Sequence, residues 1–245
     1  MGDRLASHLH FAHSRRFPGV RPTVIAQQSP HPQTPASSEY VCVPAQLATA
    51  RPQWRPEKQL RAPLLSPVRG WLLDDGSLTQ RLVRSGREFS LQRWRQVWEA
   101  PQLDERRLLQ SPLRERALVR QVVLRLDGEP VVFARSVFPA STLTGPLMRL
   151  RRLANQSLGT FLFNRSDMRR SPFELALLHG ASEYLPPALR QSAPAWARRS
   201  CFMVAGKPLL VSEVFLQGFP AWEATIPLHR SRRGQVSAAI GRSKQ

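Results

Sequence analysis

The feature that most restricts how this chain can fold is the Asp127-Gly128 dipeptide between two alternating segments. Residues 117–126 and 130–138 each carry apolar side chains at alternate positions, a pattern that is typical of β-strands. An Asp-Gly pair between two such segments favours a tight two-residue turn. The sequence therefore predicts an antiparallel β-hairpin over residues 117–138.

A second hairpin is predicted near the end of the chain. Residues 200–204 and 208–216 form its strands on either side of Ala205-Gly206-Lys207, and residues 89–98 are compatible with a further strand. Four segments have patterns expected of helices: residues 66–74, residues 77–85 opened by the capping sequence Ser77-Leu78-Thr79-Gln80, residues 146–153 and residues 172–178. Antiparallel hairpins with helices before and between them indicate an α+β domain whose sheet is covered by helices.

The chain is strongly basic, with a net charge of +19 from 36 basic and 17 acidic residues. All but three of the basic residues are arginines, and they are spread along the chain. Because zinc-finger spacing and the aromatic motifs of RNA-binding sheets are missing, we expect no nucleic-acid partner. No apolar run approaches the roughly 20 residues of a membrane-spanning helix. Two cysteines exclude a disulfide-rich scaffold or a four-cysteine metal site, so we expect a cytoplasmic protein without metal.

Proline divides the chain into regions. Residues 1–60 contain 8 of the 22 prolines and keep no helical or strand period. We therefore expect a flexible, proline-rich extension over residues 1–55 and a single folded domain over residues 56–220. Residues 221–245 are expected to form a flexible basic tail.

The first predicted hairpin contains an unusual pair of charges. Alternate residues of a strand share a face, which places Arg120 in line with four aliphatic side chains. If Asp127 and Gly128 form the turn, Arg120 faces Arg135 across the hairpin, on a face that should be buried. At about 6 Å and an effective dielectric constant near 20, the two charges repel by roughly 3 kcal/mol. A negative group is therefore expected between or beside Arg120 and Arg135.

Glu213 is the candidate for a buried negative group. The predicted strand 208–216 is apolar on both faces, which is typical of a central strand, and it places Glu213 inside the domain. A buried carboxylate must be paired, hydrogen-bonded or protonated. Two interpretations remain open: a salt-bridge cluster with the arginines, or a pocket whose arginines bind an anionic ligand. One glutamate leaves two arginines with net positive charge, and the planar guanidinium suits a carboxylate.

Six blocks of sequence carry a resemblance to a known family: Trp71–Thr79, Leu124–Pro130, Ala134–Pro146, Leu158–Phe163, Trp196–Ser200 and Gly206–Phe215. In this order, over roughly 160 residues, they resemble the chorismate pyruvate-lyase family, which makes 4-hydroxybenzoate at the start of bacterial ubiquinone biosynthesis. The proline-rich front, the basic tail and a longer linker around residues 178–194 depart from the usual family pattern. Leu78 stands where family members often have methionine.

The resemblance implies a cofactor-free lyase that converts chorismate to 4-hydroxybenzoate and pyruvate on an antiparallel sheet of about six strands flanked by helices. By motif position, it implies substrate contacts at Arg120, Glu213, Leu78 and Leu158. Arg120 would meet the ring carboxylate, and Glu213 would lie near the 4-hydroxyl and serve as a general acid or base. Leu78 needs to contribute only its backbone N–H at the start of a helix, whereas Leu158 either contacts the substrate or packs in the core. We add the hypothesis that Arg135 receives the enolpyruvyl carboxylate, which makes it the third catalytic candidate.

A non-catalytic sensor is the alternative, because ligand-binding domains of certain bacterial transcription regulators resemble the same fold. Such regulators normally carry an N-terminal helix-turn-helix, which the proline-broken residues 1–60 do not resemble. We expect a monomer that takes the small molecule chorismate as its substrate. Turnover of chorismate distinguishes a lyase from a binding-only domain, and steeply salt-dependent retention on DNA would indicate a nucleic-acid-binding protein instead.

Overall fold

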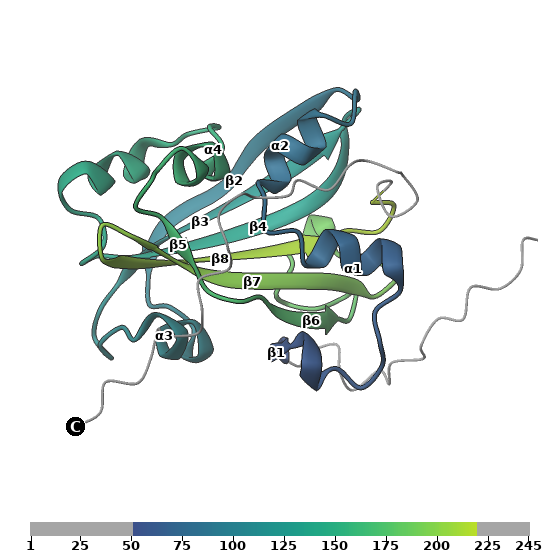
Figure 1. Cartoon of the computed structure of the whole chain (residues 1–245), viewed down its shortest axis with the longest axis horizontal. Helices are drawn as coiled ribbons and strands as arrows, with labels where there is room; N and C mark the ends of the chain where they lie inside the picture. Colours follow the sequence, from purple (N-terminus) through teal and green to yellow (C-terminus); the bar gives the residue numbers. More distant parts are fainter. Residues whose placement is uncertain (1–50, 220–245) are drawn as a thin grey trace, which may run out of the picture. The chain divides into compact units, whose positions relative to one another are not determined.

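The computed structural model describes residues 51–219, so the predictions for the two ends of the chain lie outside the described residues. Its centre is an antiparallel sheet (Figure 1) with these strands: β1 (Arg55–Pro56), β2 (Phe89–Glu99), β3 (Ala117–Leu126), β4 (Glu129–Pro139), β5 (Arg169–Arg170), β6 (Glu174–Leu178), β7 (Ala195–Val204) and β8 (Lys207–Phe215). The strands are ordered β1-β6-β7-β8-β4-β3-β2, and β5 pairs with β7 beside this path. Because β1 and β5 are only two residues long, six strands carry most of the sheet, as predicted.

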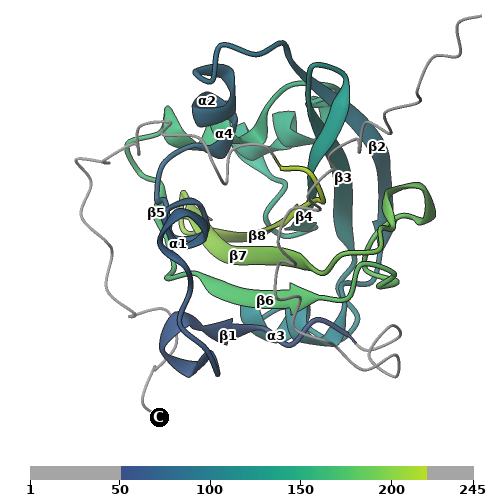
Figure 2. The same ribbon diagram turned by 90° about the vertical axis from the view of Figure 1, so that its right-hand side faces the viewer.

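Short helices cover both faces of the sheet: α1 (Ser66–Leu72), α2 (Leu78–Val83), α3 (Leu103–Leu109) and α4 (Leu158–Phe163), with 3₁₀ turns η2 (Glu57–Gln59), η3 (Gly145–Arg152) and η4 (Pro187–Leu189). Leucines of α1, α2, α4 and η3 pack on one face of the sheet. Leucines of α3 and η4 pack on the other face. Figure 2 shows α1, α2 and α4 on one side of the curved sheet and α3 on the opposite side. The prediction of an α+β fold is confirmed.

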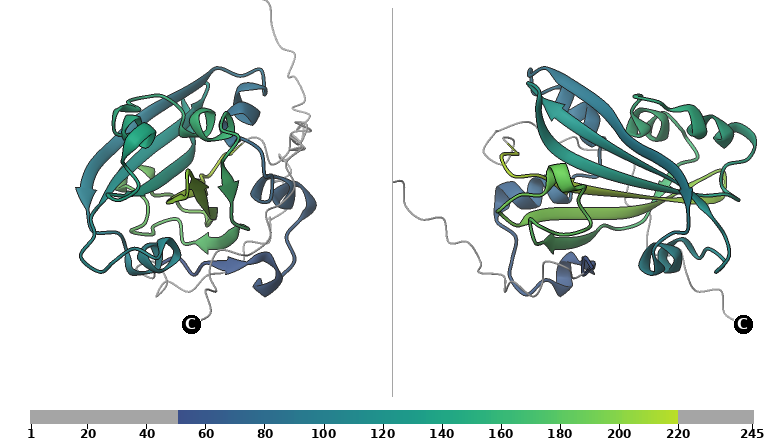
Figure 3. Two further views of the ribbon diagram at one scale, coloured as in Figure 1. Left: turned by 60° about the vertical axis from the view of Figure 1, so that its left-hand side comes forward. Right: turned by 180° about the vertical axis from the view of Figure 1, so that it is seen from behind.

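Both predicted hairpins form, and the backbone conformation of each turn explains why glycine is found at its second position. In the turn between β3 and β4, Asp127 has φ of 50° and Gly128 has φ of 81°. In the turn between β7 and β8, Ala205 and Gly206 have φ of 50° and 71°. Two successive residues with positive φ match the right-handed twist of the flanking strands, and Asp and Gly tolerate this conformation well. The strong twist of the sheet is seen from two further directions in Figure 3.

The predicted register of the first hairpin is wrong by one residue. Near the turn, Arg125 lies opposite Pro130 as expected, but the pairing then shifts and Leu124 lies opposite Val132. Val131 is therefore an extra residue on β4, a β-bulge. Beyond it, Arg120 lies opposite Ser136. Because side chains alternate between faces, a shift of one residue turns every later side chain of β4 to the opposite face from the one predicted.

The helix predicted over residues 172–178 is also wrong, because Glu174–Leu178 is strand β6. This strand lies between β1 and β7 and pairs Leu175 with Arg198 and Ala176 with Ala197. Five residues are too few for periodicity to separate a helix from a strand, so pairing with neighbouring strands decides the outcome. The segment 146–153 forms the 3₁₀ turn η3 rather than an α-helix.

Candidate active site

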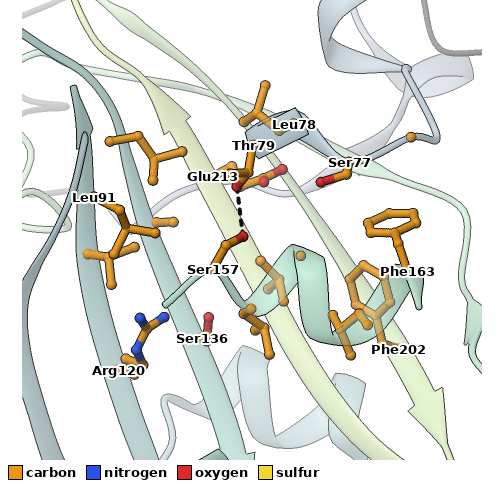
Figure 4. A pocket seen from close by; sticks show the side chains of 18 of the residues that line it. Ser77, Leu78, Thr79, Leu91, Arg120, Ser136, Ser157, Phe163, Phe202 and Glu213 are labelled. Atoms are coloured by element: carbon orange, nitrogen blue, oxygen red, sulfur yellow. Dashed lines mark hydrogen bonds between the residues drawn. The ribbon is translucent and has the colours of Figure 1, made fainter. Parts of the chain in front are cut away.

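A pocket lies between the sheet and the helices α2 and α4 (Figure 4). Its floor is formed by side chains of β3, β4, β7 and β8, and its cover includes the first residues of α2 and α4. The volume is about 560 Å³, including the part that opens to solvent. The lining includes Arg120 and Glu213, two of the residues predicted to surround an anionic ligand.

Arg120 reaches the pocket from β3 although it is only 1% exposed. Its Nη2 donates hydrogen bonds to the backbone carbonyls of Ala154 at 2.9 Å and Gln156 at 2.8 Å. Its Nε is buried without a hydrogen-bond partner, and no carboxylate among the described residues pairs with the guanidinium. Burial, and next the positive charge of Arg93, lower the pKa of Arg120 to about 10, so it remains a cation at neutral pH. A buried cation without a counter-ion is costly unless an anion joins it.

Glu213 enters the pocket from β8, the middle strand of the sheet order. Its Oε2 accepts a hydrogen bond of 2.6 Å from Nε of Arg198, which is 1% exposed. Arg198 also donates from Nη1 to the carbonyls of Trp71 and Asp74, each at 2.9 Å. Since no described residue donates to Glu213 Oε1, the carboxylate is held by one oxygen and can accept a hydrogen bond from a ligand with the other.

Leu78 and Leu158 are both in the pocket lining, each as the first residue of a helix. The two helices begin in the same way, since Ser77 caps α2 and Ser157 caps α4. Ser157 donates a hydrogen bond of 3.0 Å to Oγ1 of Thr79, which joins the two helix starts above the pocket (Figure 4). The structure therefore brings Arg120, Glu213 and the two leucines around one cavity.

Arg135 does not reach this pocket, because the bulge in β4 turns it to the other face of the sheet. There its Nε and Nη2 donate to the two carboxylate oxygens of Glu105 at 2.7 and 3.0 Å, and its Nη1 donates to Glu99 at 3.2 Å. Burial by itself would lower the pKa of Arg135, but the hydrogen bonds and charge of Glu105 outweigh it and raise the pKa. The prediction that Arg120 and Arg135 face each other is wrong. Ser136 takes the position in the pocket instead.

Two arginines that were not predicted from the sequence, Arg170 and Arg198, also line the pocket. Strand β7 begins at Ala195 rather than at residue 200, and extending the alternation back from Phe202 would have placed Arg198 on the pocket face. Arg170 lies in the two-residue strand β5, which is too short to give a periodic signal. With Arg120 and Glu213, the charged residues of the lining are three arginines and one glutamate, a net charge of +2. Such a lining suits a doubly negative ligand.

Two further properties concern the described part of the chain as a whole. Within residues 51–219, no helix is both long and apolar enough to cross a membrane. In the same range, no group of three or more His, Cys, Asp or Glu side chains is arranged to hold a metal ion.

Comparisons of the amino-acid sequence with protein families and with individual proteins point to the same family. A family model described as chorismate lyase matches residues 48–225. The chain is 37% identical over 201 residues to a protein named probable chorismate pyruvate-lyase from Idiomarina loihiensis, an alignment that covers 80% of this chain and 100% of that protein. It is 42% identical over 154 residues to a protein of the same name from Methylococcus capsulatus, covering 61% and 94% of the two chains.

Among solved structures, the chain is similar to the effector domain of PhnF from Mycobacterium smegmatis. The sequence identity is 16% and the TM-score is 0.44, over 58% of this chain and 89% of that domain. A likeness of this size carries no argument about function.

Proposed function

This chain belongs to the chorismate lyase family, and from this premise we propose that it is a chorismate pyruvate-lyase. It converts chorismate to 4-hydroxybenzoate and pyruvate in the pocket between the sheet and the helices α2 and α4. One observation supports placing the reaction in this pocket. Arg120 is a buried cation in the pocket lining, and no carboxylate among the described residues pairs with it. The ring carboxylate of chorismate supplies the missing negative charge.

The reaction needs no oxidant or reductant. The bond between the ring carbon and the ether oxygen breaks, and the neighbouring carbon, which bears the hydroxyl, loses its hydrogen as a proton. The electrons of that C–H bond complete the aromatic ring, while the departing enolpyruvate gains a proton and becomes pyruvate. The protein therefore has to hold both carboxylates, align the ether for elimination and exclude water.

The remaining residues of the pocket have complementary roles in this proposal. Glu213 accepts a hydrogen bond from the ring hydroxyl with the oxygen that Arg198 leaves free. The same carboxylate lies where it can act as a general base or acid for the transferred proton. Leu78 and Leu158 close the pocket over the apolar ring from the starts of α2 and α4.

The finer assignments belong to the same proposal. We infer that 4-hydroxybenzoate made here enters ubiquinone biosynthesis and that the enzyme works in the cytoplasm as a monomer. Catalysis by this site uses no metal or organic cofactor, and the arginine excess serves no nucleic-acid partner.

The test is to mix the purified full chain with chorismate and to measure 4-hydroxybenzoate and pyruvate in equal amounts. Replacing Arg120 with methionine removes the charge-assisted hydrogen bonds to the ring carboxylate, so kcat/KM should fall by about 100-fold or more. The matched control is Arg125→Met, on the same strand and opposite face, where Nη1 donates to the carbonyl of Gly128 near the turn. It should keep kcat/KM within about twofold, because surface substitutions of this kind have small effects.

The same assay separates the lyase from a binding-only domain. A sensor would bind chorismate or 4-hydroxybenzoate without forming product. Absence of turnover by the wild-type chain, or full turnover by Arg120→Met, would contradict the proposed function.

A further inference from the structure

Arg170 is a second arginine in the pocket whose charge has no partner. Its Nε donates to Oγ of Ser200 at 2.8 Å, and its Nη1 donates to the carbonyl of Asp75 at 3.2 Å. Its guanidinium carbon lies 3.9 Å from the ring centre of Phe173 and 4.8 Å from that of Phe202. These contacts hold the side chain in one position. None of them neutralises its charge.

The absence of a carboxylate partner distinguishes Arg170 from Arg198 and Arg81, two nearby arginines that are buried. Arg198 is paired with Glu213, and Arg81 is paired with Asp74 at 3.1 Å. Arg170, by contrast, forms no ion pair with any residue between 51 and 219. Burial, and next the repulsion from Arg198, lower the pKa of its guanidinium to about 9, which leaves it positively charged at neutral pH.

Arg170 and Arg120 approach the pocket from different parts of the sheet. Arg120 is on β3, whereas Arg170 is on β5, which pairs with β7. Strands β4, β8 and β7 lie between β3 and β5, so the two backbones are separated by four strand spacings, about 19 Å along the curved sheet. The charges close enough to affect the pKa of Arg170 include Glu213, while Arg93 is the one that affects Arg120. Arg170 therefore belongs to the Glu213 side of the pocket.

The geometry of the substrate matches this arrangement. In chorismate, the ring carboxylate and the ring hydroxyl lie on opposite carbons, and the enolpyruvyl ether is attached next to the hydroxyl. With the ring carboxylate on Arg120 and the hydroxyl on Glu213, the enolpyruvyl carboxylate lies on the same side of the pocket as Arg170. The net lining charge of +2 then meets a ligand of charge −2.

We propose that Arg170 binds the carboxylate of the enolpyruvyl group, the part of the substrate that leaves as pyruvate. This inference rests on the proposed lyase function and replaces Arg135, which the fold turns away from the pocket. It has a consequence for specificity, because 4-hydroxybenzoate retains the ring carboxylate and has lost the other one. Arg170 is thus the residue by which the site distinguishes substrate from aromatic product, while Arg120 binds both.

The experiment compares Arg170→Met with Arg120→Met and with the neighbour control Arg169→Met, whose side chain is exposed and outside the pocket lining. Steady-state kinetics with chorismate and calorimetric Kd values for 4-hydroxybenzoate are measured for each full-length variant. Loss of a charge-assisted contact should lower kcat/KM of Arg170→Met by about 10- to 100-fold. Its Kd for 4-hydroxybenzoate should stay within about threefold of the wild type. Arg120→Met should weaken both, and Arg169→Met neither.

A second variant covers the case in which Arg170→Met does not fold. Arg170→Lys keeps the charge and the aliphatic stem over Phe173 but loses the planar fork, so it should lower kcat/KM for chorismate less and again leave the 4-hydroxybenzoate Kd unchanged. Unchanged kcat/KM in Arg170→Met, or equal loss of chorismate and 4-hydroxybenzoate binding in either variant, would overturn the inference. A wild-type chain without turnover would overturn the lyase function instead, and the ratio of chorismate to 4-hydroxybenzoate affinity in Arg170→Lys would still decide the role of Arg170.

Discussion

Arg120 and Arg135 are both buried arginines of the central sheet, and they differ in what neutralises them. Arg135 meets two carboxylates, of which Glu105 binds it through both oxygens. Arg120 meets only backbone carbonyls. A buried charge that is already paired has no capacity left for a ligand, whereas an unpaired one is stabilised when a carboxylate binds. At the scale of single residues, the presence or absence of a partner carboxylate separates a structural arginine from a binding arginine.

The ion pair between Arg135 and Glu105, on the face of the sheet opposite the pocket, leads to a prediction about the free energy of unfolding. Replacing Glu105 with leucine leaves the Arg135 charge buried with only the partly exposed Glu99, and breaking such a pair costs about 3–5 kcal/mol. Urea unfolding should show this loss, while kcat/KM for chorismate of the folded protein should stay within about twofold, because neither residue lines the pocket.

The control is the double variant Glu105→Leu/Arg135→Leu. Removing both charges should recover at least half of the lost unfolding free energy, since the uncompensated charge is gone. If Arg135→Leu alone reduced kcat/KM by 100-fold, Arg135 would take part in catalysis despite its place on the other face.

At the scale of secondary-structure elements, α2 and α4 pack closely together where their first residues line the pocket. Gly159 is the second residue of α4, and a Cβ atom there would lie 3.0 Å from Oγ of Ser77 and 3.4 Å from Oγ of Ser157. A side chain at residue 159 would require these serine hydroxyls to move by at least a few tenths of an ångström, so glycine favours the close approach of the two helix starts. The same glycine lies in one of the sequence blocks that resemble the lyase family.

The valine variant at this position tests the role of the contact. Gly159→Val should force α4 away from α2, because overpacking of this kind costs about 1–3 kcal/mol. Since Leu78 and Leu158 would move with the helices, the calorimetric Kd for 4-hydroxybenzoate should rise about tenfold.

The control is a glycine that is tightly packed elsewhere. A Cβ on Gly180, in the loop after β6, would lie 2.2 Å from the carbonyl oxygen of Gln191 and outside the pocket lining. Gly180→Ala should therefore lower the melting temperature without changing the affinity for 4-hydroxybenzoate. Equal affinity in Gly159→Val and the wild type would show that the helix contact does not shape the site.

Local sequence patterns predict which residues of one strand share a face, but they do not predict how two strands pair. The alternation in β3 correctly placed Arg120 on a buried face among aliphatic side chains, because periodicity within a strand depends only on the strand itself. The face of Arg135 depended on the pairing between two strands, and the bulge at Val131 reversed it. The helix prediction for residues 172–178 is wrong because the strand identity of β6 depends on pairing with β7, which no local pattern shows.

At the scale of the whole molecule, ligand binding should stabilise the fold, because the pocket is built from strands and helices that are distant in sequence. At a 4-hydroxybenzoate concentration of 100 times Kd, the gain in unfolding free energy is about 2.7 kcal/mol. For a domain of this size that corresponds to a rise in melting temperature of roughly 5–10 °C.

Thermal melts with and without 4-hydroxybenzoate measure this shift. Arg120→Met should lose most of it, since the ring carboxylate then has no cation to bind, whereas Glu105→Leu should keep it on a lower baseline. A full shift in Arg120→Met would mean that the ring carboxylate binds elsewhere.

Sequence by itself determined the two hairpins and their turns, the serine cap before Leu78, and the buried position of Arg120. These features follow from conformational preferences and periodicities that act over a few neighbouring residues. Tertiary structure alone decided that Arg135 leaves the pocket and that Arg170 and Arg198 enter it. Those positions depend on strand register and on pairing between segments far apart in the chain, where the free energy comes from long-range packing that no local pattern encodes.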